Sequence, residues 1–298
     1  MAELPIVQGS RVHGCRQRQW WFYFGAGMLK TRFFAAVLFC LTAGLVPAAA
    51  WAQSSVYIEE LTTQEVSAAL KAGKTTILIP IGGTEQNGPH MAIGKHNTRA
   101  KALAGKIAVS LGNALVAPVL TYTPEGNIDP PTEHMGFAGT ISISEDTFKN
   151  ILLGTALSFK KHGFLDVVLL GDSGNYQKAL AAVAVQFNRQ AAKSNVRVHY
   201  IAEYYRITQT AYIDSLKARG LTSIEIGTHA GSADTSLLMA IDSTMVRTER
   251  FAEAARGGWA SGTLGDPRAS SAANGQLGVD AVVKITADVI KKATAAPR

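Results

Sequence analysis

Three short polar segments hold the residues whose types could do chemistry. The first, residues 82–98, carries Glu85, His90 and His96 among closely spaced glycines and a Gly-Pro pair. Carboxylates and imidazoles at this density can bind a divalent cation or move a proton, although a polar turn is the ordinary alternative. Because an apolar run directly precedes this segment, the sequence favours a hydrolase-type site after a buried strand.

The other two segments add further acids, a hydroxyl and an imidazole. Residues 171–177 contain Asp172 and Ser173, and residues 227–236 contain His229 and Asp234. Ser173 lies in a Gly-Asp-Ser-Gly tetrapeptide that some serine nucleophiles share, but the tetrapeptide alone is a weak signal. Asp234 could instead cap the helix that follows it. If the three segments converge, an acid, an imidazole and a second acid face one point.

The elements that would position these segments alternate between apolar runs and helical stretches. Continuous apolar strands separated by helices are typical of a parallel sheet covered on both faces, so we expect an α/β fold, a three-layer α/β/α sandwich around a mostly parallel sheet. Ligands in such folds lie beyond the carboxyl ends of the strands, where the three polar segments begin. Strands are predicted at 76–81, 114–120, 166–170 and 196–201, and helices at 97–111, 145–162, 177–192 and 279–292.

The first 52 residues have the pattern of a leader. A basic start at Met28 precedes an apolar run of 14 residues, Phe33 to Val46, and Ala50-Trp51-Ala52 ends the stretch. This pattern predicts a secretory signal peptide that is cleaved after Ala52. The alternative is an uncleaved anchor, but the run is shorter than the ~20 residues of a spanning helix. We therefore expect a periplasmic or secreted single domain over residues 53–298.

Removal of this leader changes the composition. Five basic residues and one acidic residue leave with it, so the formal net charge falls from +7 to +3. No basic stripe with interleaved aromatics remains, so nucleic-acid binding is not supported. Cys15 and Cys40 are also lost, which leaves no disulfide and no thiolate ligand. We expect no stable membrane association of the mature chain.

Four ordered segments resemble motifs of the creatininase family. Residues 83–94 resemble its GSxEQHGPHLPLG segment, residues 229–236 its HAGxxETS segment, residues 171–176 its NGHGGN segment, and residues 139–142, preceded by His134, its H..FPGT segment. The resemblance covers about residues 56 to 285. It implies an α/β/α sandwich, often hexameric, in which two divalent metals activate water to hydrolyse a C–N bond.

The resemblance also implies roles for individual residues. Glu85 matches the family's first metal ligand, and His229 matches a histidine credited with proton transfer. At four further ligand positions this sequence differs from the family: Asn87 stands for a histidine, His96 for the bridging aspartate, Ser173 for a histidine, and Asp234 for a glutamate. An imidazole nitrogen binds one metal and cannot bridge two. We therefore expect one metal per chain.

The resulting hypothesis is a metal-dependent amidohydrolase that acts on a small amide or cyclic amide. Glu85, His96 and Asp234 would hold one Zn²⁺ or Mn²⁺, with Asn87 as a weaker partner and Asp172 as a substitute for the missing histidine. His229 or His90 would move the proton. Two alternatives stay open. The chain could be a catalytically impaired small-molecule binding protein, or Ser173 and His229 could support a metal-free reaction.

Several other residues could border a pocket. Glu125, Asp129 and His134 lie in a Pro-rich stretch that could equally form an oligomer contact. Tyr204, Tyr205 and Arg206 could line an entrance, although core packing is the commoner place for such tyrosines. Lys95 could orient an anionic substrate or lie in solvent.

Overall fold

A four-stranded parallel sheet forms the centre of the computed structural model, which describes residues 55–297. The strands lie in the order β2 (Ala114–Val116), β1 (Thr76–Ile81), β3 (Asp166–Gly171) and β4 (Arg197–Tyr200), and every neighbouring pair is parallel. All residues of β1, β2 and β3 are buried. Continuous burial is what the unbroken apolar runs predict for a sheet covered on both faces.

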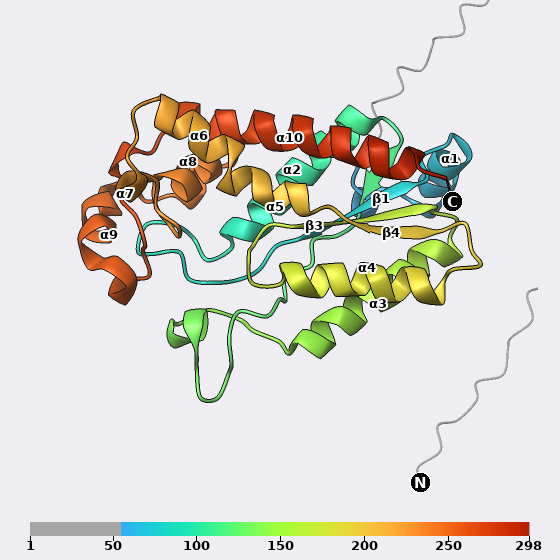
Figure 1. Cartoon of the computed structure of the whole chain (residues 1–298), viewed down its shortest axis with the longest axis horizontal. Helices are drawn as coiled ribbons and strands as arrows, with labels where there is room; N and C mark the ends of the chain where they lie inside the picture. The colour runs from blue at the N-terminus through green and yellow to red at the C-terminus, as the bar shows by residue number, and fades with distance from the viewer. Residues whose placement is uncertain (1–54, 298) are drawn as a thin grey trace, which may run out of the picture. The chain divides into compact units, whose positions relative to one another are not determined.

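Helices cover both faces of this sheet, as Figure 1 shows. Alternate β1 residues point to opposite faces: Ile77 and Ile79 pack with α3 and α4, whereas Leu78 packs with α2, α5 and α10. The two apolar layers make the predicted three-layer α/β/α sandwich, and that prediction is confirmed. The helices are α1 (Thr63–Lys71), α2 (Lys95–Leu111), α3 (Glu145–Lys161), α4 (Gln177–Gln190), α5 (Ala202–Gln209), α6 (Ala211–Ala218), α7 (Ser223–Ile226), α8 (Ser232–Ile241), α9 (Phe251–Gly257) and α10 (Ala272–Ala295), with six short 3₁₀ turns between them.

Strand β2 and helix α10 differ most from their predicted bounds, whereas the other predicted elements agree to within two residues at each end. Strand β2 ends at Val116 rather than at residue 120, although the chain still makes scattered bonds to β1 through the amides of residues 117 and 120. Helix α10 begins at Ala272, seven residues before its predicted start, because the Ser271 side chain caps it. Its first turns contain Gly275, where a Cβ would collide with the Ser236 carbonyl of α8. The glycine that weakens the helical pattern is what lets the two helices pack closely.

The strand order creates the crevice that positions the site. From β1 the chain moves outward to β2, and from β3 it moves outward the other way to β4, so β1 and β3 flank a topological switch point. Ile81 and Gly171, the last residues of these strands, are paired in register. Ligands of open α/β sheets bind outside the carboxyl ends at such a point. The polar segments after β1 and β3 therefore begin side by side.

The predicted leader lies outside the described residues. The boundary at Ala52 and the single domain over residues 53–298 therefore stay predictions. Within residues 55–297, no helix is long and apolar enough to cross a membrane.

Candidate active site

The loop after β1 carries a buried carboxylate. Glu85 is 1% exposed, and its backbone amide donates to the Ile93 carbonyl, which closes the loop on itself. Asn87 holds the same loop from within, because its Nδ2 donates to the carbonyl oxygens of Glu85 and Ala92. The loop thus folds around its own amide groups and presents the Glu85 carboxylate to the switch-point crevice.

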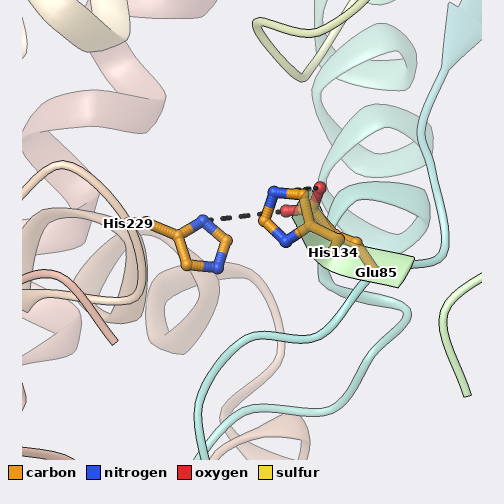
Figure 2. Close-up of side chains that lie close together, drawn as sticks. All are labelled: Glu85, His134 and His229. Atoms are coloured by element: carbon orange, nitrogen blue, oxygen red, sulfur yellow. Dashed lines mark ion pairs between the residues drawn. The ribbon is translucent and has the colours of Figure 1, made fainter. Parts of the chain in front are cut away.

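Two histidines from distant loops face this carboxylate (Figure 2). His134 Nε2 lies 3.5 Å from Glu85 Oε2, and His229 Nδ1 lies 3.8 Å from Glu85 Oε1. One ligand atom from each residue lies within 4.8 Å of the others. Glu85 Oε2 is buried and accepts no hydrogen bond from an amide, hydroxyl or imidazole of the described residues. The Glu125 carboxyl lies beside the Glu85 carboxylate, and burial together with the Glu85 charge raises the pKa of Glu125 to about 8. We call Glu85, His134 and His229 the open side of the site.

The Gln86 side chain lies behind both imidazoles and influences which nitrogen carries the proton. His229 Nε2 lies 3.1 Å from the Gln86 carbonyl, so this nitrogen donates and the lone pair lies on Nδ1, toward Glu85. Gln86 Nε2 lies 3.1 Å from His134 Nδ1 and 3.2 Å from His229 Nε2. As placed, Gln86 Oε1 accepts the Gly88 amide and Nε2 donates to His134 Nδ1, so the His134 proton lies on Nε2, toward Glu85. A half-turn of the amide would free His134 Nε2 as a ligand at the cost of the bond from Gly88.

The protonation states on the open side suit a cation. Burial, with the nearby Lys95 charge, lowers the pKa of His229 to about 4, and burial lowers the pKa of His134 as well. Burial raises the pKa of Glu85, but His96 and Lys95 outweigh it and hold the pKa well below its ordinary value. At neutral pH the open side is therefore one carboxylate and two neutral imidazoles. Such a donor set fits a Zn²⁺ site with two histidines and one glutamate.

A second cluster, which we call the paired side, adjoins the first and consists of His96, Arg99, Asp172 and Asp234. His96 donates or accepts at both ring nitrogens, with Nδ1 2.6 Å from Asp172 Oδ2 and Nε2 2.8 Å from Glu85 Oε1. Arg99 reaches Asp172 Oδ2 at 2.8 Å through NH2 and Asp234 Oδ1 at 2.7 Å through NH1. Asp234 also accepts the Ala230 amide, but it is the third residue of α8 and Gly231 is the N-cap, so the capping alternative is wrong.

The charges on the paired side stabilise one another. Burial lowers the pKa of His96, but Glu85 and Asp172 outweigh it and raise that pKa above the ordinary value. Burial raises the pKa of Asp234, whereas Lys95 and Arg99 hold it well below its ordinary value. These shifts favour protonated His96 and ionised Asp234. The paired side therefore has its lone pairs and protons engaged in internal bonds.

The two sides line one cavity of about 230 Å³. Its wall includes Lys95 and, nearer the surface, Trp259, whose ring lies 5.6 Å from His134 and 6.0 Å from His229 in edge-on contact. A larger hollow of about 670 Å³ lies beside it between residues 124 and 145 and shares Asn175 with it. The larger hollow is lined by no histidine, so the smaller cavity is the candidate site.

Most of the residues predicted from the sequence do converge on this cavity. Six of them line its wall: Glu85, His96, Asp172, Ser173, His229 and Asp234. Of the ligands predicted, however, only Glu85 belongs to the open side, because the ring nitrogens of His96 are both engaged with carboxylates. His229, predicted to move a proton, faces the same carboxylate through Nδ1.

Two predicted residues lie away from the cavity wall. His90 is fully buried, with Nε2 2.9 Å from Thr235 Oγ1 and its ring packed edge-on against Phe251. Asn87 is also fully buried within its loop. Their side chains stabilise the loop and α8, and neither faces the space where a substrate would bind.

Sequence reasoning gave too little weight to three residues. His134 appeared only as a residue that could border a pocket, Lys95 was left between substrate contact and solvent, and Arg99 was not considered. Lys95 is 1% exposed, so the solvent alternative is excluded. A signal was present: Lys95, His96 and Arg99 open α2 with one- and three-residue spacing, which places charged groups on one helical turn beside the crevice.

Among the aromatic candidates, the tyrosines have different places. Tyr205 lines the cavity, whereas Tyr204 is buried and donates from its hydroxyl to Asp172 Oδ1 at 3.2 Å. Arg206 is exposed and pairs with Glu203. Tyr204 is thus a part of the core that also orients an acid of the paired side.

A parallel α/β/α sandwich with a His–His–Glu group at its switch point is typical of hydrolases that can bind a metal ion at this position. Comparison with known proteins identifies the family. The family model described as creatininase, creatinine amidohydrolase, matches residues 59–290, and the chain belongs to this family. The resemblance seen in the sequence is therefore confirmed.

Individual relatives agree with this assignment. Creatinine amidohydrolase from Pseudomonas putida is 25% identical over 257 residues, which cover 80% of this chain and 97% of the relative. A mycofactocin precursor peptide peptidase from Mycolicibacterium smegmatis is 27% identical and covers 72% of this chain and 84% of its own length. A solved structure described as "Creatininase Mn" has a TM-score of 0.65 at 25% identity and covers 81% of this chain and 100% of the solved chain.

Proposed function

We propose that this protein is a metal-dependent amidohydrolase that hydrolyses a C–N bond of a small amide or cyclic amide. The observation that carries the proposal is the convergence of the buried Glu85 carboxylate and two imidazoles of lowered pKa, whose ligand atoms lie within 4.8 Å of one another. Glu85 Oε1 is paired with His96, whereas a cation bound between Oε2 and the two imidazoles would stabilise the other oxygen of this buried carboxylate. Membership in a family whose relatives include an amidohydrolase and a peptidase supports the reaction type.

The proposed ligands are Glu85, His134 and His229, which replace the set predicted from the sequence. One Zn²⁺ or Mn²⁺ per chain fits this donor set, and solved creatininases are described as a "Zn-Zn type" and as a manganese form. Such an ion would polarise the amide carbonyl and lower the pKa of water. The family ligands that Asn87 and Ser173 replace would thus be compensated in part by His134, which weakens the case for a non-catalytic binding protein.

The surrounding residues would orient the substrate and exclude water. Gln86 fixes the two imidazoles, and Trp259 covers their outer edges with its ring. Gly262 leaves room for the Gln86 side chain, because a Cβ at this position would overlap Gln86 Oε1. The Arg99 guanidinium holds two acids of the paired side in place. The cavity of about 230 Å³ is smaller than typical drug-sized sites, which favours a small substrate.

Metal titration tests this proposal. We expect the chelator-stripped full chain to bind about one Zn²⁺ or Mn²⁺ by isothermal titration calorimetry, and Glu85→Gln to bind at least about 100-fold more weakly. His162→Gln is the matched control, because His162 is an exposed residue at the end of α3. A panel of formamide-type, cyclic and peptide amides would then be assayed for amine release with and without chelator. The absence of any bound ion, or unchanged binding in Glu85→Gln, would contradict the proposal.

We also propose that the mature protein is exported to the periplasm or secreted and forms a homo-oligomer, as the leader pattern and the family resemblance suggest. N-terminal sequencing of the exported chain would locate the cleavage site, which we expect after Ala52. Light scattering would give the number of subunits, for which a hexamer is the expectation.

A further inference from the structure

One charged side chain in the cavity wall, Lys95, makes no short ion pair with the acids around it. Lys95, the first residue of α2, is 1% exposed and lines the cavity. An ammonium group has three N–H donors. Its contacts to acids in the described part of the chain are Asp234 Oδ2 at 3.4 Å and Glu85 Oε1 at 3.7 Å. The buried Lys95 ammonium group thus lies near two carboxylates but makes no short hydrogen bond to either.

Arg99, four residues further along the same helix, makes the short ion pairs that Lys95 lacks. Its nitrogens lie 2.7 Å from Asp234 Oδ1 and between 2.8 and 3.0 Å from Asp172 Oδ2. Charge-assisted hydrogen bonds between nitrogen and carboxylate are usually about 2.7–2.9 Å long. Arg99 therefore satisfies the acids of the paired side, whereas Lys95 keeps donor capacity for a further anion in the cavity.

The balance of charge points the same way. Glu85, Asp172 and Asp234 supply three negative charges, and Lys95 and Arg99 supply two positive charges. A protonated His96 makes the group neutral, and a neutral His96 leaves it at −1. One divalent ion on the open side then brings the total to +2 or +1. The loaded cavity has an excess of positive charge in both cases. The other polar residues of its wall, Ser173, Asn175, Tyr205, Gln209 and Thr228, carry no formal charge that would offset it.

We propose that Lys95 is an anion-binding residue of this cavity and that the amide substrate carries a carboxylate, which Lys95 Nζ binds. This inference rests on the proposed function, since it names the substrate class of the same site. An ammonium in a cavity shielded from water attracts a carboxylate more strongly than an exposed lysine does. Lys95 thereby selects amides of acids over neutral amides of the same size.

The test compares two probes that differ in charge and not in heavy-atom number: N-acetylglycine and N-acetylglycinamide. Their binding to the full chain would be measured by isothermal titration calorimetry, with the protein metal-free and loaded with Zn²⁺. We expect the acid to bind about 10- to 100-fold more tightly than the neutral amide, the range expected for a hydrogen bond to a charged group. The preference should be present in both forms and larger in the loaded form.

Variants then assign the preference to Lys95. Lys95→Met should bring the affinity for the acid down to that of the neutral amide, and Lys95→Arg should retain part of the preference. Lys101→Met is the matched control, because Lys101 is a partly exposed lysine on the same helix and lies outside the cavity wall. Circular dichroism melts would show which variants are folded. The proposal is overturned if the wild-type chain does not prefer the acid, or if folded Lys95→Met still prefers it.

The metal titration keeps the two proposals separate. If the chain binds no metal but shows a Lys95-dependent preference for the acid, the proposed function is contradicted and the anion site is supported. If the chain binds one metal and shows no preference for the acid, the proposed function is supported and the anion site is contradicted.

Discussion

The open side and the paired side of the cavity contain similar residue types but differ in how closely their polar atoms are paired. On the paired side, short ion pairs join each charged group to a partner of opposite sign. On the open side, the buried Glu85 carboxylate faces two neutral imidazoles at 3.5 Å or more and lies beside the Glu125 carboxyl. A satisfied network rigidifies a core, whereas a gap in such a network needs an explanation by a ligand. We therefore regard the paired side as the framework of the site and the open side as its reactive part.

The largest expected effect would break the paired side. Arg99→Met leaves the buried Asp172 and the partly buried Asp234 without the guanidinium that joins them, and removal of one partner from a buried ion pair typically costs about 3–5 kcal/mol. Urea unfolding followed by circular dichroism would measure the loss. Arg206→Met is the control, since this exposed pair with Glu203 should contribute less than about 1 kcal/mol. Equal losses in the two variants would remove the distinction between framework and reactive part.

A smaller effect is expected where the open side is held from behind. Gln86→Leu removes the amide that contacts both imidazoles, and loss of such a supporting contact typically lowers metal affinity about 10- to 100-fold. Gln86→Glu should retain the affinity, because its carboxylate can accept from both ring N–H groups. Zinc titration of each variant measures this. The control is Gln276→Leu, an exposed residue on α10. If Gln86→Leu binds zinc like the wild-type chain, Gln86 does not orient the ligands.

The sequence predicted the frame of this site better than its chemistry, and particular residues show why. Strand β1 was predicted with its observed bounds, because an unbroken apolar run that ends in Gly82-Gly83 has few other structures open to it. Glu85 and His229 were found because the family motifs contain them. The role of His134 depends on a loop that returns from 48 residues away to contact Gln86, and spacing along the chain does not encode this contact. His96 was predicted as a ligand from its residue type, whereas its contacts to two carboxylates, 11 and 76 residues away in the chain, are seen only in the structure.

A pH series would sharpen the contrast between the two sides with a still smaller effect. Protons compete with a metal for an imidazole, so an ordinary histidine of pKa 6.5 would lower metal affinity about 30-fold at pH 5. His229 has a pKa of about 4 and is still mostly neutral at pH 5, so its competition begins only as the pH falls toward 4. Protonation of His229 should therefore lower zinc affinity by less than about threefold between pH 7 and pH 5. A steep fall centred near pH 6.5 would show that the imidazoles are not held neutral.

The smallest expected effect concerns Ser173, which lines the cavity between the two sides. A serine nucleophile needs a base within hydrogen-bond reach, but the Ser173 hydroxyl makes one long contact, 3.5 Å from the Asn175 amide. Ser173→Ala should therefore change the free energy of unfolding by less than about 1 kcal/mol and leave zinc affinity and any amide hydrolysis unchanged. Ser142→Ala is the comparison, because the Ser142 hydroxyl accepts the Glu125 amide and donates to the Gly126 carbonyl. Hydrolysis that survives chelator and is lost in Ser173→Ala would instead support the metal-free reaction of Ser173 with His229, and the open side would then not be the reactive part.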